Sequence, residues 1–312
     1  MKIEIKETKS KDKHIEYLMP ILPNKIKCYL IEYISHNPYA IINEIRLHSN
    51  SFMILISSLV NIKTDLYINS NDIEETIISL CSGSVYSHFD TIKEGYISVG
   101  MGIRAGVCGK ASFQNGSISG ISEFSSVNIR MPKRIPFAGD YIYKILKENN
   151  FNSSILIYSS PGVGKTTILR ELIYKLSTMP SPIRFSVIDS REEIIAGDDI
   201  DASMDLYLAY PKGIAINLAT RTMTPQLIIC DEISTLDETE AILNSVNCGV
   251  KIIATTHASS FEELKNKKQI SSLLNSSVFD YAIGVERLQG SKKYVYTLNS
   301  LKECYVWNIL AP

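Results

Sequence analysis

The stretch Ile155–Ser177 reads ILIYSSPGVGKTTILRELIYKLS and decides the fold. It opens with a short apolar run that is typical of a buried strand and closes with leucines and isoleucines at helical spacing. The glycine-rich string between them ends in Gly164-Lys165-Thr166, as in a phosphate-binding P-loop. Glycines let the backbone approach a phosphate closely, and the N–H groups at a helix start favour anions. We therefore predict a strand, a P-loop and a helix rather than a simple turn.

The loop residues have distinct expected roles. Lys165 can reach the β- and γ-phosphates of a nucleotide, and the Thr166 hydroxyl can ligate Mg²⁺. Ser159 stands where the first glycine of the pattern belongs, which narrows the allowed backbone but leaves the amide donors in place. We expect ATP and Mg²⁺ as ligands. The residues expected at the nucleotide are Ser160, Pro161, Gly162, Val163, Gly164, Lys165, Thr166 and Thr167.

The sequence around the loop predicts a parallel sheet. Short β-branched runs are separated by long helical segments, which is the pattern of βαβ units with both sheet faces covered. These runs are Ile155–Tyr158, Phe185–Ile188, Leu227–Cys230 and Val250–Thr255. Two later runs, Tyr281–Leu288 and Lys293–Leu298, predict a hairpin around Gln289-Gly290-Ser291. The second half of the chain is therefore predicted to be an α/β domain.

Acidic residues and a histidine follow the predicted strands. Asp231 can belong to the Mg²⁺ shell, and Glu232 beside it can orient and deprotonate a water. Asp189 and Glu193 follow a second run, and His257 follows a third. Because ligands bind at the carboxyl ends of parallel strands, these residues are candidates for the γ-phosphate side of the site. Taken alone, acids at strand ends fit a solvated edge equally well, and a lone histidine is more often structural.

Three arginines, Arg104, Arg130 and Arg221, stand among apolar or small residues. An ATPase often uses an arginine from a neighbouring subunit to neutralise charge in the transition state. None of the three belongs to the phosphate loop, so each could face a neighbour's site. We favour Arg130, because it ends a predicted strand immediately before a linker.

The first half of the chain has a different pattern. A helix is expected after a cap at Asn71-Asp72. The predicted strands are Glu44–Leu47, Phe52–Leu59, Tyr96–Val99, Ile103–Cys108 and Val127–Met131. Two prolines between Met131 and Asp140 favour a linker. We expect a smaller α+β domain over residues 1–134 and the α/β domain over residues 135–312.

Composition excludes several classes of protein. The 312 residues are 45% hydrophobic and 21% charged, which is ordinary for a globular chain and not for a disordered one. Lys and Arg number 32 against 33 Asp and Glu, so the net charge is −1 and no nucleic-acid partner is expected. No apolar stretch approaches the roughly 18 residues of a membrane helix, and the charged N-terminus is unlike a signal peptide. We expect a cytoplasmic protein without direct membrane insertion, whose scattered cysteines are free thiols and hold no metal.

With these residues in place, the chain resembles the stage III sporulation protein AA family, a branch of the secretion-type ATPases. The matching stretches of the first half are Glu44–Leu47, Gly95–Ser98, Arg104–Ala111 and Asn128–Arg130. Those of the second half are Pro161–Thr167, Asp189–Gly197, Arg221–Gln226 and Cys230–Glu232. The first-half stretches have no bearing on generic ATP binding, so they distinguish this family from other P-loop proteins.

The resemblance implies a RecA-like P-loop ATPase domain after the α+β domain, assembled as a homo-hexamer with nucleotide between the domains. It implies an ATP-hydrolysing motor on the mother-cell side of a transenvelope sporulation channel, beside membrane-embedded channel proteins. By similarity, Asp189 falls in an Asp box and His257 in a histidine box, and Ser190 replaces a frequent second acid. Which of Asp189, Glu193 and Glu232 is the general base stays open. A RecA-like nucleic-acid motor and a non-catalytic nucleotide-sensing scaffold are the alternatives.

Overall fold

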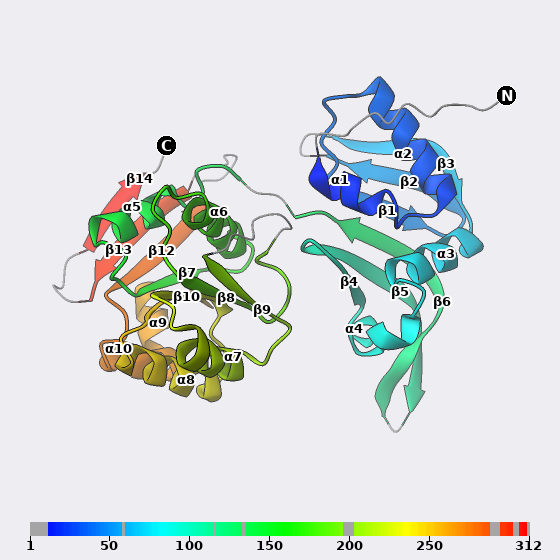
Figure 1. Cartoon of the computed structure of the whole chain (residues 1–312). Helices are drawn as coiled ribbons and strands as arrows, with labels where there is room; N and C mark the ends of the chain where they lie inside the picture. Colours follow the sequence, from blue (N-terminus) through cyan, green and yellow to red (C-terminus); the bar gives the residue numbers. More distant parts are fainter. Residues whose placement is uncertain are drawn as a thin grey trace. The chain divides into compact units, whose positions relative to one another are not determined.

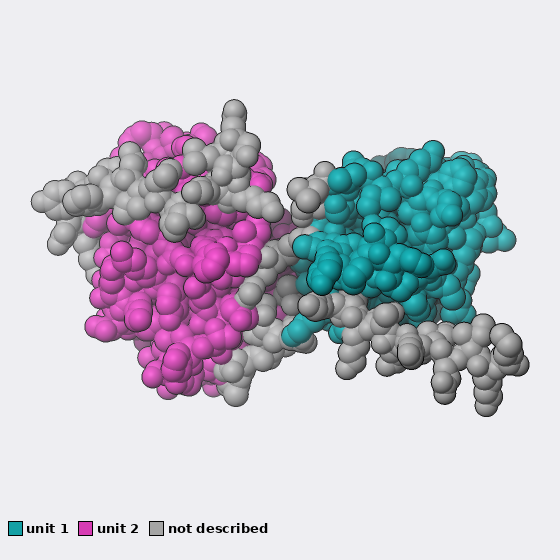
Figure 2. Space-filling model, turned by 90° about the horizontal axis from the view of Figure 1, so that it is seen from above, with its two compact units in different colours: residues 1–133 teal, residues 134–312 magenta. Residues whose placement is uncertain are grey.

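The computed structural model describes residues 12–57, 60–114, 116–132, 135–195, 203–287, 294–301 and, by backbone alone, 306–310. The chain divides into two compact units, residues 1–133 and 134–312, which Figure 2 colours teal and magenta. Parts of several sequence predictions lie outside the described residues: the end of the strand Phe52–Leu59, the hairpin turn Gln289-Gly290-Ser291 with its neighbours Leu288 and Lys293, and the end of the Asp189–Gly197 stretch. The described cysteines form no disulfide. No helix in the described part of the chain is long and apolar enough to cross a bilayer.

Unit 1 is built on an antiparallel sheet of six strands in the order β3-β2-β1-β6-β5-β4 (Figure 1). Its elements are α1 Lys13–Leu18, α2 Asn24–His36, β1 Glu44–His48, β2 Ser51–Ile56, β3 Asn61–Ile68, α3 Ser70–Leu80, η1 Val85–His88, α4 Phe89–Lys93, β4 Tyr96–Gly100, β5 Ile103–Gln114 and β6 Ser117–Arg130. Alternate strand residues such as Ile45 and Ile129 are buried with Leu30 and Ile77 of the helices. One sheet face therefore carries the core, and the other carries the polar residues.

Unit 1 differs from the sequence prediction in several places, and strand β3 (Asn61–Ile68) was not predicted. The helix expected after Asn71-Asp72 is α3, which begins at Ser70 because Asn69 and Asp72 form a reciprocal capping box. Strand β5 continues well past its predicted end, and β6 begins well before its predicted start. The residues of β5 from Cys108 onward are exposed, so this extension lacks the alternation of apolar and polar residues from which a strand is predicted.

Unit 2 is built on a sheet of eight strands in the order β14-β13-β12-β7-β11-β10-β8-β9. Its elements are α5 Asp140–Glu148, β7 Ile155–Ser159, α6 Lys165–Ser177, β8 Phe185–Asp189, β9 Met204–Leu208, α7 Lys212–Leu218, η2 Ala219–Met223, β10 Leu227–Glu232, α8 Leu236–Asn247, β11 Lys251–His257, α9 Phe261–Asn266, α10 Lys268–Asn275, β12 Tyr281–Arg287, β13 Tyr294–Ser300 and β14 Val306–Leu310. The strands from β12 to β9 are parallel, and β13 and β14 extend the sheet antiparallel. The predicted α/β fold with a parallel central sheet is confirmed.

Helices cover both faces of the unit 2 sheet. Helices α5 and α6 pack with one set of alternate strand residues, including Ile229 and Ile253. Helices α7, α8, α9 and α10 pack with the other set, including Ile228 and Ile252, on the opposite face in Figure 1. The strands β7, β8, β10 and β11 run in the same direction and end at Ser159, Asp189, Glu232 and His257. These last residues therefore lie along one edge of the sheet.

Candidate functional site

The loop between β7 and α6 has the backbone that its glycines predict. Gly162 and Gly164 have φ angles of 77° and 122°, which side chains other than glycine rarely adopt. At Gly164 a Cβ atom would also lie only 2.6 Å from Tyr294 Oη. Ser159 is the last residue of β7 and has extended backbone, so this position needs no glycine. Helix α6 begins immediately after the loop, and its first N–H groups are available to an anion.

Lys165 is a buried cation with no carboxylate among its contacts in the described chain. Its Nζ donates to the Ser159 carbonyl and hydroxyl oxygens, each at 3.2 Å, and lies 2.7 Å from His257 Nδ1. Burial lowers the pKa of Lys165 from its usual value to about 8, with Glu232 opposing and Lys267 adding to the shift. The ammonium group therefore has no directly bonded carboxylate within the described residues, and the effect of burial on its pKa outweighs the attraction of Glu232.

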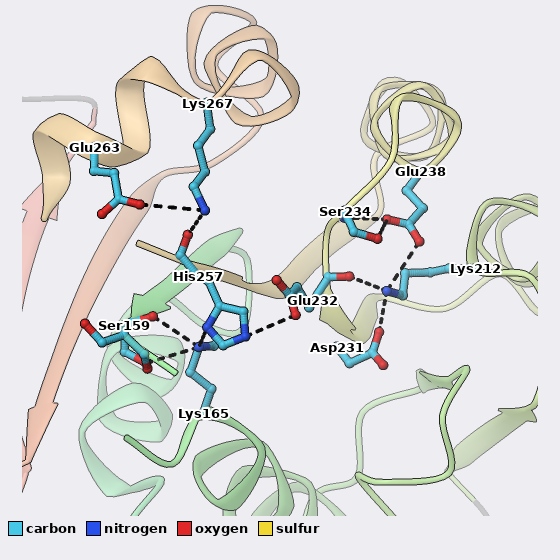
Figure 3. A network of polar contacts seen from close by, with 11 residues as sticks. Ser159, Lys165, Lys212, Asp231, Glu232, Ser234, Glu238, His257, Glu263 and Lys267 are labelled. Atoms are coloured by element: carbon cyan, nitrogen blue, oxygen red, sulfur yellow. Dashed lines mark hydrogen bonds and ion pairs between the residues drawn. The ribbon is translucent and has the colours of Figure 1, made fainter. Parts of the chain in front are cut away.

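His257 connects Lys165 to Glu232 (Figure 3). Strand β11 places His257 in register with Ser159 of β7, next to the phosphate loop. Because Lys165 can only donate, His257 Nδ1 must accept, and the ring proton then lies on Nε2. Nε2 is 3.2 Å from Glu232 Oε2. The three side chains thus form a continuous chain of polar contacts from the loop to the end of β10.

Asp231 lies beside this chain and is bound by a lysine that the sequence analysis missed. Lys212, the first residue of α7, forms ion pairs with Asp231 Oδ1 and with Glu238 Oε1, the latter at 3.5 Å. Its Nζ also donates to the backbone carbonyl oxygen of Glu232. The ion pairs raise the pKa of Lys212 against the effect of burial, so it stays charged. The one sequence feature that could have drawn attention to Lys212 is that it is the sole charged residue between Asp205 and Arg221.

Asp189 is fully buried at the end of β8 and holds the loop that follows. Its carboxylate accepts hydrogen bonds from the backbone N–H groups of Glu193, Ile194 and Ile195 at 2.8 to 3.0 Å. Burial raises the pKa of Asp189, and these three amides oppose the rise. Glu193 contributes its backbone, since its carbonyl oxygen accepts from Arg170 Nε at 2.9 Å. The expected γ-phosphate role of Asp189 and Glu193 gains no support from these contacts.

The three candidate arginines belong to η2 of unit 2 and to strands β5 and β6 of unit 1. Arg221 is exposed on η2 of unit 2. Arg130 ends β6 of unit 1 with 68% of its side chain exposed, and its Nε is 3.5 Å from Glu44 Oε1. Arg104 stacks its guanidinium over the Tyr96 ring at 4.7 Å and lies directly across from Arg130 in register. Two like charges side by side are unfavourable unless an anion neutralises them.

The residues of unit 2 fit a nucleotide phosphate better than a metal ion by itself. The glycine loop, the start of α6 and the Lys165 ammonium form a cationic cradle. No group of three or more His, Cys, Asp or Glu side chains that could hold a metal occurs within the described residues. The Thr166 hydroxyl, in the first turn of α6, and the Asp231 carboxylate, near the end of β10, are oxygen ligands of the kind that Mg²⁺ prefers.

The comparisons with known proteins agree with this geometry. Stage III sporulation protein AA of Bacillus subtilis (strain 168) is 26% identical over 279 residues, which span 86% of this chain and 90% of the relative. Two similar structures are the Legionella pneumophila ATPase DotB and the pilus retraction motor PilT with bound ADP. DotB has a TM-score of 0.63 and 14% identity over 91% of this chain and 84% of its own. PilT has a TM-score of 0.60 and 16% identity over 86% of this chain and 82% of the PilT chain.

At such identities the two structures show that the chain shares their fold. The family described as "Sporulation stage III, protein AA" matches residues 12–299, which include the antiparallel unit, the phosphate loop and the strand ends that follow it. The chain belongs to the sporulation stage III protein AA family.

Proposed function

We propose that the chain is a Mg²⁺-dependent ATPase that powers a secretion-like channel in sporulation. The observation that carries this proposal is the buried Lys165 ammonium, which has no carboxylate partner within the described residues and lies at the start of α6. A buried cation is costly unless an anion neutralises it. The phosphates of ATP would supply that charge, and family membership supplies the cellular context.

Each residue of the site has a proposed role in hydrolysis. The loop residues Ser160–Thr167 would hold the phosphates, with Lys165 on the β- and γ-phosphate oxygens. Thr166 and Asp231 would provide oxygen ligands for Mg²⁺, which would neutralise charge on the phosphates of ATP. The Glu232 carboxylate would orient a water and accept its proton. His257 donates its Nε2 proton toward Glu232 and so keeps the carboxylate in place.

A pair of substitutions tests this assignment. Glu232→Gln is isosteric but cannot accept a proton, so it should retain ATP binding and lose turnover by about 10²- to 10⁴-fold. Steady-state phosphate release and titration with a fluorescent ATP analogue measure the two effects. Asp189→Asn is the matched comparison at the next strand end. Wild-type turnover in Glu232→Gln together with its loss in Asp189→Asn would assign the general base to Asp189.

We further propose that the site is completed between subunits of a homo-hexamer in the cytoplasm of the mother cell, beside membrane-embedded channel proteins. The favoured trans-acting arginine is Arg130, because it ends β6 of unit 1 and 68% of its side chain is exposed, which leaves the guanidinium accessible to a neighbouring subunit. An arginine supplied in trans can raise the rate of hydrolysis by roughly 10³- to 10⁵-fold.

Assembly can be tested directly. Specific ATPase activity should rise with protein concentration, and light scattering should detect larger species when ATP is added. Arg130→Ala should lower turnover more than ATP affinity, whereas Arg221→Ala serves as the comparison on unit 2. Specific activity that is independent of concentration would exclude a site completed by a neighbour. Hydrolysis stimulated by DNA and steeply weakened by salt would instead favour a nucleic-acid motor.

A further inference from the structure

Strand β10 contains a register shift next to the proposed base. Ile229 pairs with Ile253 of β11, but the next paired residue is Glu232, opposite Thr255. Three steps along β10 thus match two steps along β11, which is a β-bulge. Bulges often lie beside active sites, where they redirect a side chain.

The bulge changes the sheet face to which Glu232 belongs. In a regular strand, a residue three positions after Ile229 would point to the opposite face. Ile229 and Ile253 both pack on the α5 and α6 face. Thr255 shares the face of Ile253, so its register partner Glu232 is brought to that face too. His257 shares it as well, two residues further along β11. Without the bulge, Glu232 would point toward α7–α10 and away from His257.

Lys212 contacts both residues at the end of the bulge, Asp231 and Glu232. Its Nζ pairs with the Asp231 carboxylate and donates to the Glu232 carbonyl oxygen (Figure 3). The same ammonium is 3.5 Å from Glu238 Oε1. The other oxygen of Glu238 accepts from the backbone N–H of Ser234 at 2.7 Å and of Thr235 at 3.1 Å, which fixes the start of α8. One buried ammonium therefore connects α7, the end of β10 and α8.

A second lysine shows what a weaker form of this contact looks like. Lys267 Nζ donates to the backbone carbonyl oxygen of His257, at the end of the neighbouring strand. Its side chain is 34% exposed, and its ion-pair partner Glu263 is 3.9 Å away. The Lys212 side chain is only 6% exposed and has two carboxylates. Water can replace Lys267 at its carbonyl more easily than Lys212.

We propose that Lys212 is a positioning residue, which stabilises the β10 bulge and thereby directs the Glu232 carboxylate toward His257 and the phosphate loop. This inference rests on the proposed ATPase function. It predicts that Lys212 acts on turnover through Glu232 and contributes little to nucleotide binding, since the bound phosphates are held by the loop and Lys165.

The first test separates turnover from binding. Lys212→Met should lower kcat about tenfold or more while the affinity for a fluorescent ATP analogue stays within about threefold. Lys267→Met should lower kcat less. Lys265→Met is the matched control, because Lys265 is half exposed and contacts Glu262 and the Phe261 ring of its own helix α9. A purely structural lysine would reduce binding and turnover together as the folded fraction falls.

The second test asks whether Lys212 acts through Glu232. If it does, Lys212→Met combined with Glu232→Gln should be no slower than Glu232→Gln alone, because the two losses share one cause. Additive losses would contradict the proposal.

A charge-balanced variant guards against misfolding. Lys212→Met with Glu238→Gln removes one cation and one anion, and glutamine can still accept the α8 capping hydrogen bonds. The double variant should retain the kcat loss, and Glu238→Gln alone should stay within about threefold of the wild type. Wild-type kcat in the folded double variant would overturn the inference and leave the ATPase proposal intact. Absence of hydrolysis in the wild-type protein at assembling concentrations would instead remove the ATPase proposal, and the inference with it.

Discussion

Two buried lysines of unit 2, Lys165 and Lys212, lie on either side of Glu232 and differ in their partners. Each exposes only 7% of its surface. Lys165 contacts neutral oxygens and a histidine nitrogen, and burial lowers its pKa to about 8. Lys212 contacts two carboxylates and a carbonyl, and its pKa is raised. The first cation has no carboxylate in direct contact within the described chain, and the second has two.

This difference distinguishes a lysine that would bind a ligand, Lys165, from a lysine that would position its neighbours, Lys212. A buried ammonium without an anion reduces the stability of the fold, so its presence indicates a ligand that carries the missing charge. A buried ammonium with two carboxylates is part of a network whose members all depend on one another. Substitution of the two lysines should therefore change different properties of the protein, and the following predictions are built on that contrast.

The largest effect is expected on stability at Lys212. Lys212→Met leaves the carboxylates of Asp231 and Glu238 buried without their cation, which typically costs about 3–5 kcal/mol of unfolding free energy. Lys165→Met removes a cation with no carboxylate partner and should leave the unfolding free energy unchanged or higher. Urea unfolding followed by circular dichroism at pH 7 measures both. Equal destabilisation by the two substitutions would erase the contrast.

The next effect is expected on nucleotide binding at Lys165. Lys165→Ala removes the only cation of the phosphate loop, so affinity for a fluorescent ATP analogue should fall by about 100-fold or more while the protein remains folded. Lys212→Met is the matched comparison and should bind normally. ATP affinity that is unchanged in a folded Lys165→Ala protein would disprove the role of the loop.

A smaller effect is expected from pH. Phosphate binding favours the charged form of Lys165, whose pKa in the free protein is about 8. The charged fraction falls about tenfold between pH 7 and pH 9, so affinity for the ATP analogue should fall by a similar factor. Lys212, with its raised pKa, stays charged over this range. The weaker affinity of Lys165→Met for the ATP analogue should not change between pH 7 and pH 9. If it falls as much as the affinity of the wild type does, another group is responsible for the pH dependence.

The same pKa gives a linked prediction for stability. An unfolded lysine has its usual pKa of 10.5, and the folded Lys165 has one of about 8. Between these values the unfolded state binds more protons, so the contribution of Lys165 to unfolding free energy rises with pH. Below about pH 8 the full destabilising contribution is present. The difference in urea midpoint between Lys165→Met and the wild type should therefore shrink as pH rises from 8 toward 10.5.

These contrasts also show how far the sequence could predict the site. Lys165 and Glu232 follow local patterns, namely a glycine loop between a strand and a helix and an acid after an apolar run. Lys212 is distant in sequence from every residue that it contacts, and its role depends on the register between β10 and β11. A register shift is set by tertiary packing and leaves no periodic signal, so the sequence could not predict the bulge or its lysine.

Asp189 shows a different limit of sequence reasoning. An acid at the end of a buried strand has the same local pattern whether it faces a ligand or its own loop. The structure bonds Asp189 to three backbone amides of the following turn, which only the path of residues 190–195 could reveal. The pattern therefore predicts that the acids share one edge of the sheet, and it leaves open which of them would act on a ligand.

The smallest effect is expected at Ser159, the one departure from the P-loop pattern. Its hydroxyl accepts from Lys165 at 3.2 Å and donates to the Ser160 carbonyl at 2.9 Å, but its backbone is extended and belongs to β7. Ser159→Gly would restore the usual residue and remove one of three contacts that hold Lys165. Because the Ser159 carbonyl and His257 remain, ATP-analogue affinity should change by no more than about threefold. A much larger change would mean that the serine hydroxyl, rather than the missing phosphate charge, determines the state of Lys165.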